Sequence, residues 1–144
     1  MKLIQLSTFL ENKPGQLTGI CKLLADNKIN ILTLTLADTR QFGILRLIIP
    51  EWEHAKKLLE DHGYTVNITE VLAFEVGDHP GGLSDLLTLF DDCSLNIEYM
   101  YAFTSRLDDK AILIFRFDDP DTALAHMKAR GVNVINSVEL YSKE

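Results

Sequence analysis

One segment of this chain occurs twice. The stretch ENKPGQLTGI at residues 11–20 corresponds to GDHPGGLSDL at residues 77–86, which lies 66 positions further on. Further matches are Leu23 with Leu89, Asn30 with Asn96 and, after a shift of two positions, Gly63 with Gly131. Such self-similarity predicts two copies of one structural unit. The shift indicates a two-residue insertion in the second copy near residues 105–110, where a hairpin loop is expected.

The repeat settles how many domains to expect. A chain of 144 residues can form one ordinary domain or two small ones, and two copies favour two. We expect a first domain at residues 1–70 and a second at residues 71–144. Residues 65–76 contain no Pro, Gly or Ser, so the last strand of the first copy should run directly into the first strand of the second.

Each copy shows the same alternation of strand and helix periodicity. A strand at residues 2–10 or 71–76 leads into a Pro-Gly turn, and an amphipathic helix follows. Proline suits the first helical turn, because its φ is preset and its missing N–H needs no partner there. A hairpin, a second helix ending at a left-handed glycine, and a last strand complete each copy. In the first copy the hairpin is expected at residues 30–39 and 42–50, the second helix at 50–64 and the last strand at 65–70. In the second copy the hairpin is expected at residues 95–105 and 110–117, the second helix at 119–132 and the last strand at 132–141. The order predicts an α+β fold of two ferredoxin-like βαββαβ units in tandem, each an antiparallel sheet with helices on one face.

Two short motifs recur at fixed places in this order. The strand-to-helix elbows contain Asn12, Pro14, Gly15, Gln16 and Leu17 in the first copy, and Asp78, Pro80, Gly81, Gly82 and Leu83 in the second. An Asn-Ile pair stands at the start of each second strand, as Asn30 with Ile31 and Asn96 with Ile97. With these motifs the whole chain resembles two tandem ACT domains, small-molecule sensing modules found in many enzymes of amino-acid metabolism. The resemblance implies that a free amino acid binds where paired ACT units meet, at the elbow and the second-strand start.

The chemistry of the elbow is consistent with such a site. A helix that begins at a glycine-containing turn leaves backbone N–H groups unpaired, and these groups attract an α-carboxylate. Glycine also lets a ligand approach the backbone, and the Asn and Asp side chains can accept from an α-ammonium group. The alternative is that each turn only caps its helix. Capping does not require the second asparagine of each copy, which favours ligand binding.

The two elbows differ in charge and size. Asp78 replaces Asn12, and Gly82 replaces Gln16, so the second elbow is expected to be more acidic and more open. If only one elbow is occupied, the second is favoured. Its ligand is then expected to be an amino acid with a polar or weakly cationic side chain, histidine among the candidates. His79 beside Pro80 either contacts this ligand or is an exposed loop residue, and the exposed loop residue is favoured.

The second strands indicate that the units pair. In residues 31–38 and 97–103, neither face is polar, although a sheet covered by helices on one side should present its other side to solvent. The pattern predicts that another unit covers this face or the strand edge, with pairing inside the chain and a homodimer. Tolerated apolar exposure is the alternative.

No constellation of catalytic or metal-binding residues is found. The chain lacks nucleophile-elbow, P-loop, zinc-protease and Cys-x-x-Cys motifs, and its four histidines have no ligand spacing. Lys13 is the nearest base where an acyl-phosphate hydrolase would need arginine. The acidic run FDDPD (117–121) precedes a helix and is expected to cap it, whereas RLDDK (106–110) falls in a hairpin loop. Phe115 and Phe117 are expected in the core or an interface, because the basic flanks of an RNA-binding sheet are absent.

Charge and hydropathy limit the partners further. The net charge of −7 arises in the second copy and disfavours nucleic acid. No apolar run approaches the roughly 20 residues of a membrane span, and the N-terminus reads as a strand, so a cytoplasmic protein is expected. The two cysteines are expected to be reduced.

These observations predict a stand-alone regulatory or sensor protein without catalysis, cofactor or metal. Its expected partners are a free amino acid, a second copy of the chain and an enzyme of amino-acid metabolism, but neither nucleic acid nor membrane. The alternative is a structural or protein-interaction module of the same fold that binds no ligand.

Overall fold

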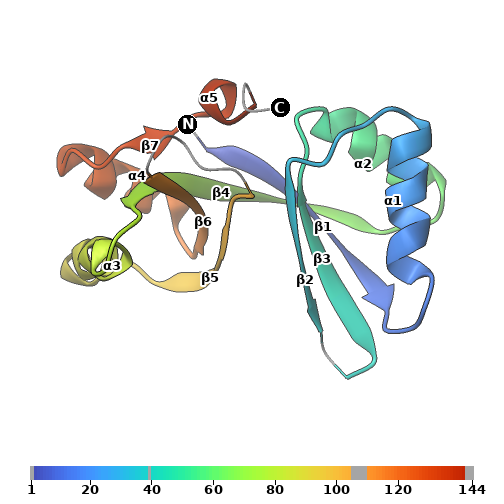
Figure 1. Cartoon of the computed structure of the whole chain (residues 1–144), viewed down its shortest axis with the longest axis horizontal. Helices are drawn as coiled ribbons and strands as arrows, with labels where there is room; N and C mark the ends of the chain where they lie inside the picture. Colours follow the sequence, from blue (N-terminus) through green and yellow to red (C-terminus); the bar gives the residue numbers. More distant parts are fainter. Residues whose placement is uncertain (1, 39, 105–109, 142–144) are drawn as a thin grey trace. The chain divides into compact units, whose positions relative to one another are not determined.

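The computed structural model describes residues 2–38, 40–104 and 110–141. The chain divides into two compact units. The first unit covers Ile4–Thr69, and the second begins at Glu70 and also takes in Leu3. Figure 1 shows the elements of both units. Within the described ranges no helix has the length and apolar character that a membrane span requires.

The first unit has the predicted order of elements. They are β1 (Leu3–Glu11), α1 (Gln16–Asp26), β2 (Thr33–Asp38), β3 (Phe42–Ile48), α2 (Trp52–Asp61) and the start of β4 (Val66–Gly77). The strands lie in the order β2-β3-β1-β4, and β3 is antiparallel to both β1 and β2. Both helices cover one face of this sheet (Figure 1). Leucines of β1 and β3 pack there against Ile20 and Leu24, which recur at helical spacing on α1.

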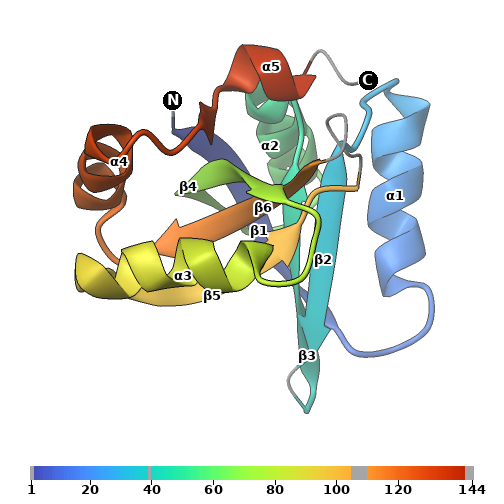
Figure 2. The same ribbon diagram turned by 60° about the vertical axis from the view of Figure 1, so that its left-hand side comes forward.

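The second unit repeats this arrangement on the other half of β4. Its further elements are α3 (Gly82–Asp92), β5 (Ile97–Ala102), β6 (Lys110–Phe117), α4 (Pro120–Ala129), β7 (Val134–Ile135) and α5 (Ser137–Tyr141). The strand order is β7-β4-β6-β5, with antiparallel pairing throughout. Helices α3 and α4 cover one face of the sheet (Figure 2). The prediction of two α+β ferredoxin-like units is therefore confirmed.

Four phenylalanines form the centre of the second core. Phe74, Phe90, Phe115 and Phe117 are all fully or almost fully buried. The ring centroid of Phe90 lies 5.1 Å from the centroid of Phe115 and 5.1 Å from that of Phe117, and its ring plane is nearly perpendicular to both of their planes. Edge-to-face contacts of this kind add to the free energy gained by burial. The FRF segment thus serves the core, one of the two roles predicted for it.

The junction between the copies is one continuous strand, as predicted. Strand β4 runs for 12 residues without a break from the first unit into the second. Its apolar residues and the absence of Pro and Gly before Gly77 permit this extended run. The glycines that end α2 and α4 also behave as predicted, because Gly63 and Gly131 have φ angles of 91° and 72°.

The prediction of a last strand over residues 132–141 is wrong. Only Val134 and Ile135 pair with β4, and the chain then forms α5. The side chain of Asn136 accepts a hydrogen bond from the N–H of Glu139 at 2.9 Å, which is the geometry of a helix cap and ends the extended run. Leu140 is fully buried and fixes α5 by packing. The predicted insertion near residues 105–110 falls mainly on residues 105–109, outside the described residues.

Asp119 caps α4, which the acidic run before this helix predicted. Its carboxylate accepts from the Thr122 hydroxyl at 2.6 Å and from the Thr122 N–H at 3.1 Å. These two hydrogen bonds favour the charged form and lower the pKa of Asp119 below its ordinary value of 3.8.

We expect Asp119→Ala to lower the melting temperature at neutral pH. Because the pKa of Asp119 is depressed in the folded state, its stabilising effect is present above pH 3.8 and is lost as the pH falls through the folded value. Melting curves of the variant and the wild type should therefore approach each other in acid. A difference in melting temperature that stays constant down to the lowest measurable pH would contradict this role.

Candidate functional site

Both elbows hold a glycine in the left-handed region just before a helix. Gly15 and Gly81 are the N-caps of α1 and α3, with φ angles of 91° and 89°. A Cβ at either position would meet nothing within 4 Å, so the φ angle and not crowding accounts for glycine there. Pro14 and Pro80 lie in the turn before the N-cap, which corrects the prediction that proline occupies the first helical turn. Proline restricts the turn and glycine completes it.

Neither helix has a side-chain cap. The N-cap glycines of α1 and α3 offer no side-chain acceptor. The first N–H groups of a helix have no intrahelical partner. At these elbows the N–H of Gln16 and that of Gly82 donate within the turn, to the carbonyls of Lys13 at 3.5 Å and His79 at 3.0 Å, so a ligand would have to use N–H groups further into the first turn.

Gly82 has a different role from the one predicted. It was expected to open the second elbow to a ligand, yet a Cβ on Gly82 would overlap the carbonyl oxygen of Gly77. Gly82 is buried, and its missing side chain lets the first turn of α3 pack directly on the end of β4. Gln16, at the same place in the first elbow, carries a half-buried side chain. The difference between the elbows thus arises from packing.

A small pocket adjoins the first elbow on the side of β2 and β3. Its volume is about 80 Å³. It brings together three predicted site residues, which are Asn12, Gln16 and Leu17, with Leu36 and Gly43 from the strands. Glu11 and Lys13 also line it and form an ion pair of 3.0 Å with each other.

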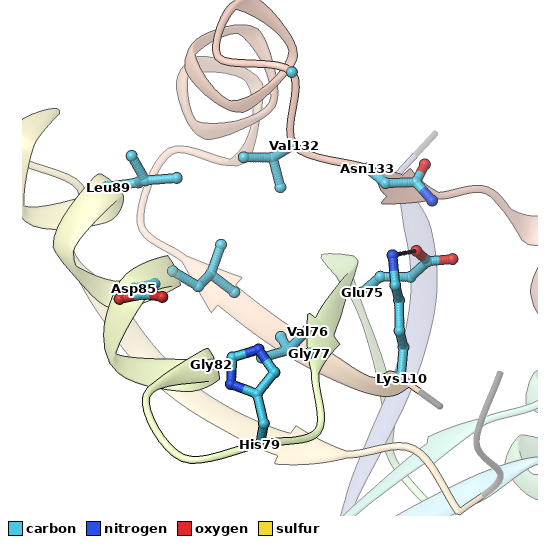
Figure 3. A pocket seen from close by; sticks show the side chains of 12 residues that line it. Glu75, Val76, Gly77, His79, Gly82, Asp85, Leu89, Lys110, Val132 and Asn133 are labelled. Carbon is cyan, nitrogen blue, oxygen red and sulfur yellow. Dashed lines mark ion pairs between the residues drawn. The ribbon is translucent and has the colours of Figure 1, made fainter. Parts of the chain in front are cut away.

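A larger pocket adjoins the second elbow, on the side of β7. Its volume is about 350 Å³. Backbone pairing along this edge of β4 ends where the N–H of Glu75 donates to the carbonyl of Asn133 at 3.4 Å. Val76 and Gly77 continue past that point and line the pocket together with α3 and the segment after α4 (Figure 3). The short β7 therefore leaves the end of β4 unpaired on the side of the pocket.

Charged groups of both signs line the larger pocket. The Lys110 Nζ lies 3.5 Å from a carboxylate oxygen of Glu75, whose side chain is only 13% exposed. Asp85 lies on the first turn of α3, across the pocket from this ion pair (Figure 3). The pocket therefore offers a cation to a carboxylate, and carboxylates to a cation.

His79 lies in the elbow loop and is exposed, yet it also lines the larger pocket. Its Nδ1 is 2.9 Å from the carbonyl oxygen of Pro80, which can only accept, so Nδ1 carries the hydrogen. The edge of the ring that carries Nε2 lies against Gly77. His79 is thus an exposed loop residue, the role favoured from sequence, and it lies where it could contact a ligand in the pocket.

The remaining predicted residues of the second elbow do not line the larger pocket. These are Asp78, Pro80, Gly81 and Leu83, whereas Gly82 lines it. In the first elbow, Pro14 and Gly15 form the turn beside the smaller pocket.

Within one unit, the two Asn-Ile pairs lie far from the elbows. Gly77 pairs with Lys110 at one end of β6, and Ile97 pairs with Phe117 at the other. The six residues between Lys110 and Phe117 correspond to about 20 Å along a strand. The first unit is alike, because Asn30 and Ile31 precede β2 at the end opposite Asn12. A site that joins an elbow to an Asn-Ile pair therefore needs residues from more than one unit.

Several pocket residues were missed from sequence. Glu75, Asp85, Lys110 and Val132 line the larger pocket but belong to neither motif. A comparison of the copies could have indicated them, since their counterparts are Phe9, Gly19, Phe42 and Tyr64. Charged residues that replace apolar ones in one copy of a repeat are a signal of divergent function. Within the described residues, no three His, Cys, Asp or Glu side chains are grouped as metal ligands would be.

Comparisons with known proteins agree with this architecture. The family model described as "ACT domain pair" matches residues 1–143. The crystal structure of protein BT0572 from Bacteroides thetaiotaomicron is 35% identical, covers 98% of this chain and 96% of its own, and superposes with a TM-score of 0.91. The regulatory subunit of aspartate kinase from Thermus thermophilus, in a ligand-free form, is 14% identical over 89% of this chain and 90% of its own, with a TM-score of 0.64. The regulatory subunit of aspartate kinase from Thermus flavus is 16% identical over 88% of this chain and 88% of its own, with a TM-score of 0.62. A search of curated proteins gives no match.

Proposed function

Because the chain belongs to the family of ACT domain pairs, we propose that it is a regulatory protein that binds a free amino acid and carries out no chemistry itself. The observation that carries this proposal is the pocket of about 350 Å³ at the second elbow. It combines an uncapped helix N-terminus with side chains of both charges. Its volume lies at the lower end of the range of about 300–1,000 Å³ in which proteins bind small molecules.

The charges of the pocket indicate how a zwitterion would bind. The α-carboxylate would accept from Lys110 and from the N–H groups in the first turn of α3 that have no backbone partner, because both carry positive charge. Asp85 and Glu75 would then accept from the α-ammonium group or from a cationic side chain. A polar or weakly cationic side chain therefore fits best, with histidine among the candidates.

A second unit would complete this site. Asn96 lies about 20 Å from the second elbow within its own unit, so its participation requires pairing of two units. Edge strand β2 supports such pairing, because its Leu34 and Leu36 are 40% and 48% exposed. We therefore expect units to pair and the chain to form a homodimer. Regulatory subunits of aspartate kinase share this fold, and an enzyme of amino-acid metabolism is accordingly the expected recipient of the signal.

Thermal melting in the presence of each common amino acid tests the proposal. A compound that binds only the folded state stabilises it by about 2.7 kcal/mol at 100 times its dissociation constant. One amino acid, or a few of similar chemistry, should raise the melting temperature. If none does so, the alternative of a structural or protein-interaction module without a ligand is favoured.

Two substitutions test the part assigned to the second strands. Asn30 and Asn96 are exposed, so their replacement by alanine should change the free energy of unfolding by less than about 1 kcal/mol. At least one of the two variants should lose the stabilisation by the amino acid. The exposed Asn67, outside both motifs, serves as the control through Asn67→Ala. Full response in both variants would show that this part of the site is misplaced.

A further inference from the structure

We infer that the two units are specialised: the larger pocket beside the second elbow is open, whereas Tyr64 fills the corresponding space in the first unit. The residue that decides between the two states is the one that follows the left-handed glycine after the second helix of each unit. It is Tyr64 in the first unit and Val132 in the second. This inference deepens the proposed function and rests on it for the nature of the ligand.

The positions of the two side chains carry the inference. Val132 lines the larger pocket and points into it from the segment after α4 (Figure 3). In the first unit, Tyr64 packs on the core, and its hydroxyl lies 3.5 Å from where a Cβ on Gly19 would be. The tyrosine side chain thus spans the distance from the end of α2 to α1. The shorter valine leaves the equivalent distance in the second unit open.

The helix residue that faces each of these two side chains also differs between the units. Gly19 on α1 corresponds to Asp85 on α3, and both are exposed on their helices. A Cβ at Gly19 would lie 3.5 Å from the Tyr64 hydroxyl, in ordinary van der Waals contact, whereas Asp85 faces an open pocket. In the first unit the tyrosine side chain occupies this region, whereas in the second unit the region is open.

The charges of the pocket are confined to the second unit. The ion pair of Glu75 and Lys110 has Phe9 and Phe42 as its counterparts, which are 59% and 45% exposed. Glu11 and Lys13 are charged, but they pair with each other beside the small pocket on the other side of the first elbow. That pocket of about 80 Å³ has room for only a few waters at roughly 30 Å³ each. An amino acid would thus find neither the space nor the charges beside the first elbow.

A thiol probe tests the difference in access without any ligand. Leu89 on α3 lines the pocket, and Leu23 is its counterpart on α1; both are half-buried. In a chain that also carries Cys21→Ser and Cys93→Ser, iodoacetamide should modify the Leu89→Cys variant about tenfold faster than the Leu23→Cys variant. Val132→Tyr should slow modification at position 89. Tyr64→Val should speed it at position 23. If iodoacetamide modifies both positions at equal rates, and neither Val132→Tyr nor Tyr64→Val changes those rates, the inference is overturned.

Thermal melting with each common amino acid provides the second readout. Val132→Tyr should abolish the rise in melting temperature, whereas the reciprocal Tyr64→Val, the matched control, should retain it. If Val132→Tyr shields position 89 yet keeps the full rise, the inference fails and the proposed function stands. If no amino acid stabilises the wild type, the proposed function fails, and the thiol rates still decide whether the units are specialised. Should Val132→Tyr melt too early to be used, Tyr64→Val, which only removes atoms, decides through the rate at position 23.

Discussion

Replacing Phe74 by alanine is expected to lower the free energy of unfolding by about 3–5 kcal/mol. Phe74 is fully buried, and its ring centroid lies 5.6 Å from that of Phe90 and 5.7 Å from that of Phe115. Its strand is held by β6 on one side and β7 on the other, so the backbone cannot move in to fill the cavity. Urea unfolding followed by circular dichroism measures the loss.

Two features of the chain sharpen this experiment. Phe9→Ala is a matched control, because Phe9 is 59% exposed and its loss should cost within about 0.5 kcal/mol. Trp52 is the only tryptophan and lies in α2 of the first unit, so its fluorescence follows that unit alone. In Phe74→Ala, circular dichroism should therefore begin to change at a lower urea concentration than the fluorescence. A loss below about 1 kcal/mol would show that the aromatic core repacks freely.

Gly82→Ala is expected to cost about 1–3 kcal/mol and to remove the stabilisation by an amino acid. The added Cβ would overlap the carbonyl oxygen of Gly77, whose residue is fixed by pairing with Lys110. The first turn of α3 must then move away from β4. That movement displaces both the helix N–H groups and Asp85, which are expected to hold the ligand.

The first elbow supplies the control for Gly82→Ala. Gln16 stands at the equivalent position and already carries a side chain, so Gln16→Ala should leave both stability and the amino-acid response close to those of the wild type. Thermal melts with and without the amino acids compare the two variants directly. If Gly82→Ala kept the wild-type melting temperature and response, close packing of α3 on β4 would not be required for the site.

The features predicted correctly from sequence are those with local causes. Leu83, Leu86 and Phe90 recur at helical spacing, and this spacing alone indicates a helix. The continuous β4 and the left-handed glycines after α2 and α4 likewise follow from backbone preferences at single positions. The end of the second copy was wrong because the capping side chain of Asn136 stops an otherwise β-like stretch. A single polar residue there outweighs the hydrophobic pattern.

The candidate site was predicted less well, because its parts are distant in sequence. The elbow motifs were located and one of them adjoins the larger pocket, yet Lys110 and Val132 come from segments far along the chain. The Asn-Ile pair of each unit lies at the other end of the strands from its own elbow, so the predicted site at paired units depends on how units pair. Antiparallel register decides this placement, and register is not visible in a short motif.

The sequence by itself determined the repeated βαββαβ order, the uncapped glycine elbows and the strand that joins the copies, since each depends on neighbouring residues and on the φ angles they allow. Only the tertiary structure decided that Gly82 is a packing residue and that the larger pocket opens beside the second elbow. Those properties depend on which side chains from separate elements occupy the same volume, as Tyr64 does over Gly19. Two near-identical elbows therefore acquire different surroundings.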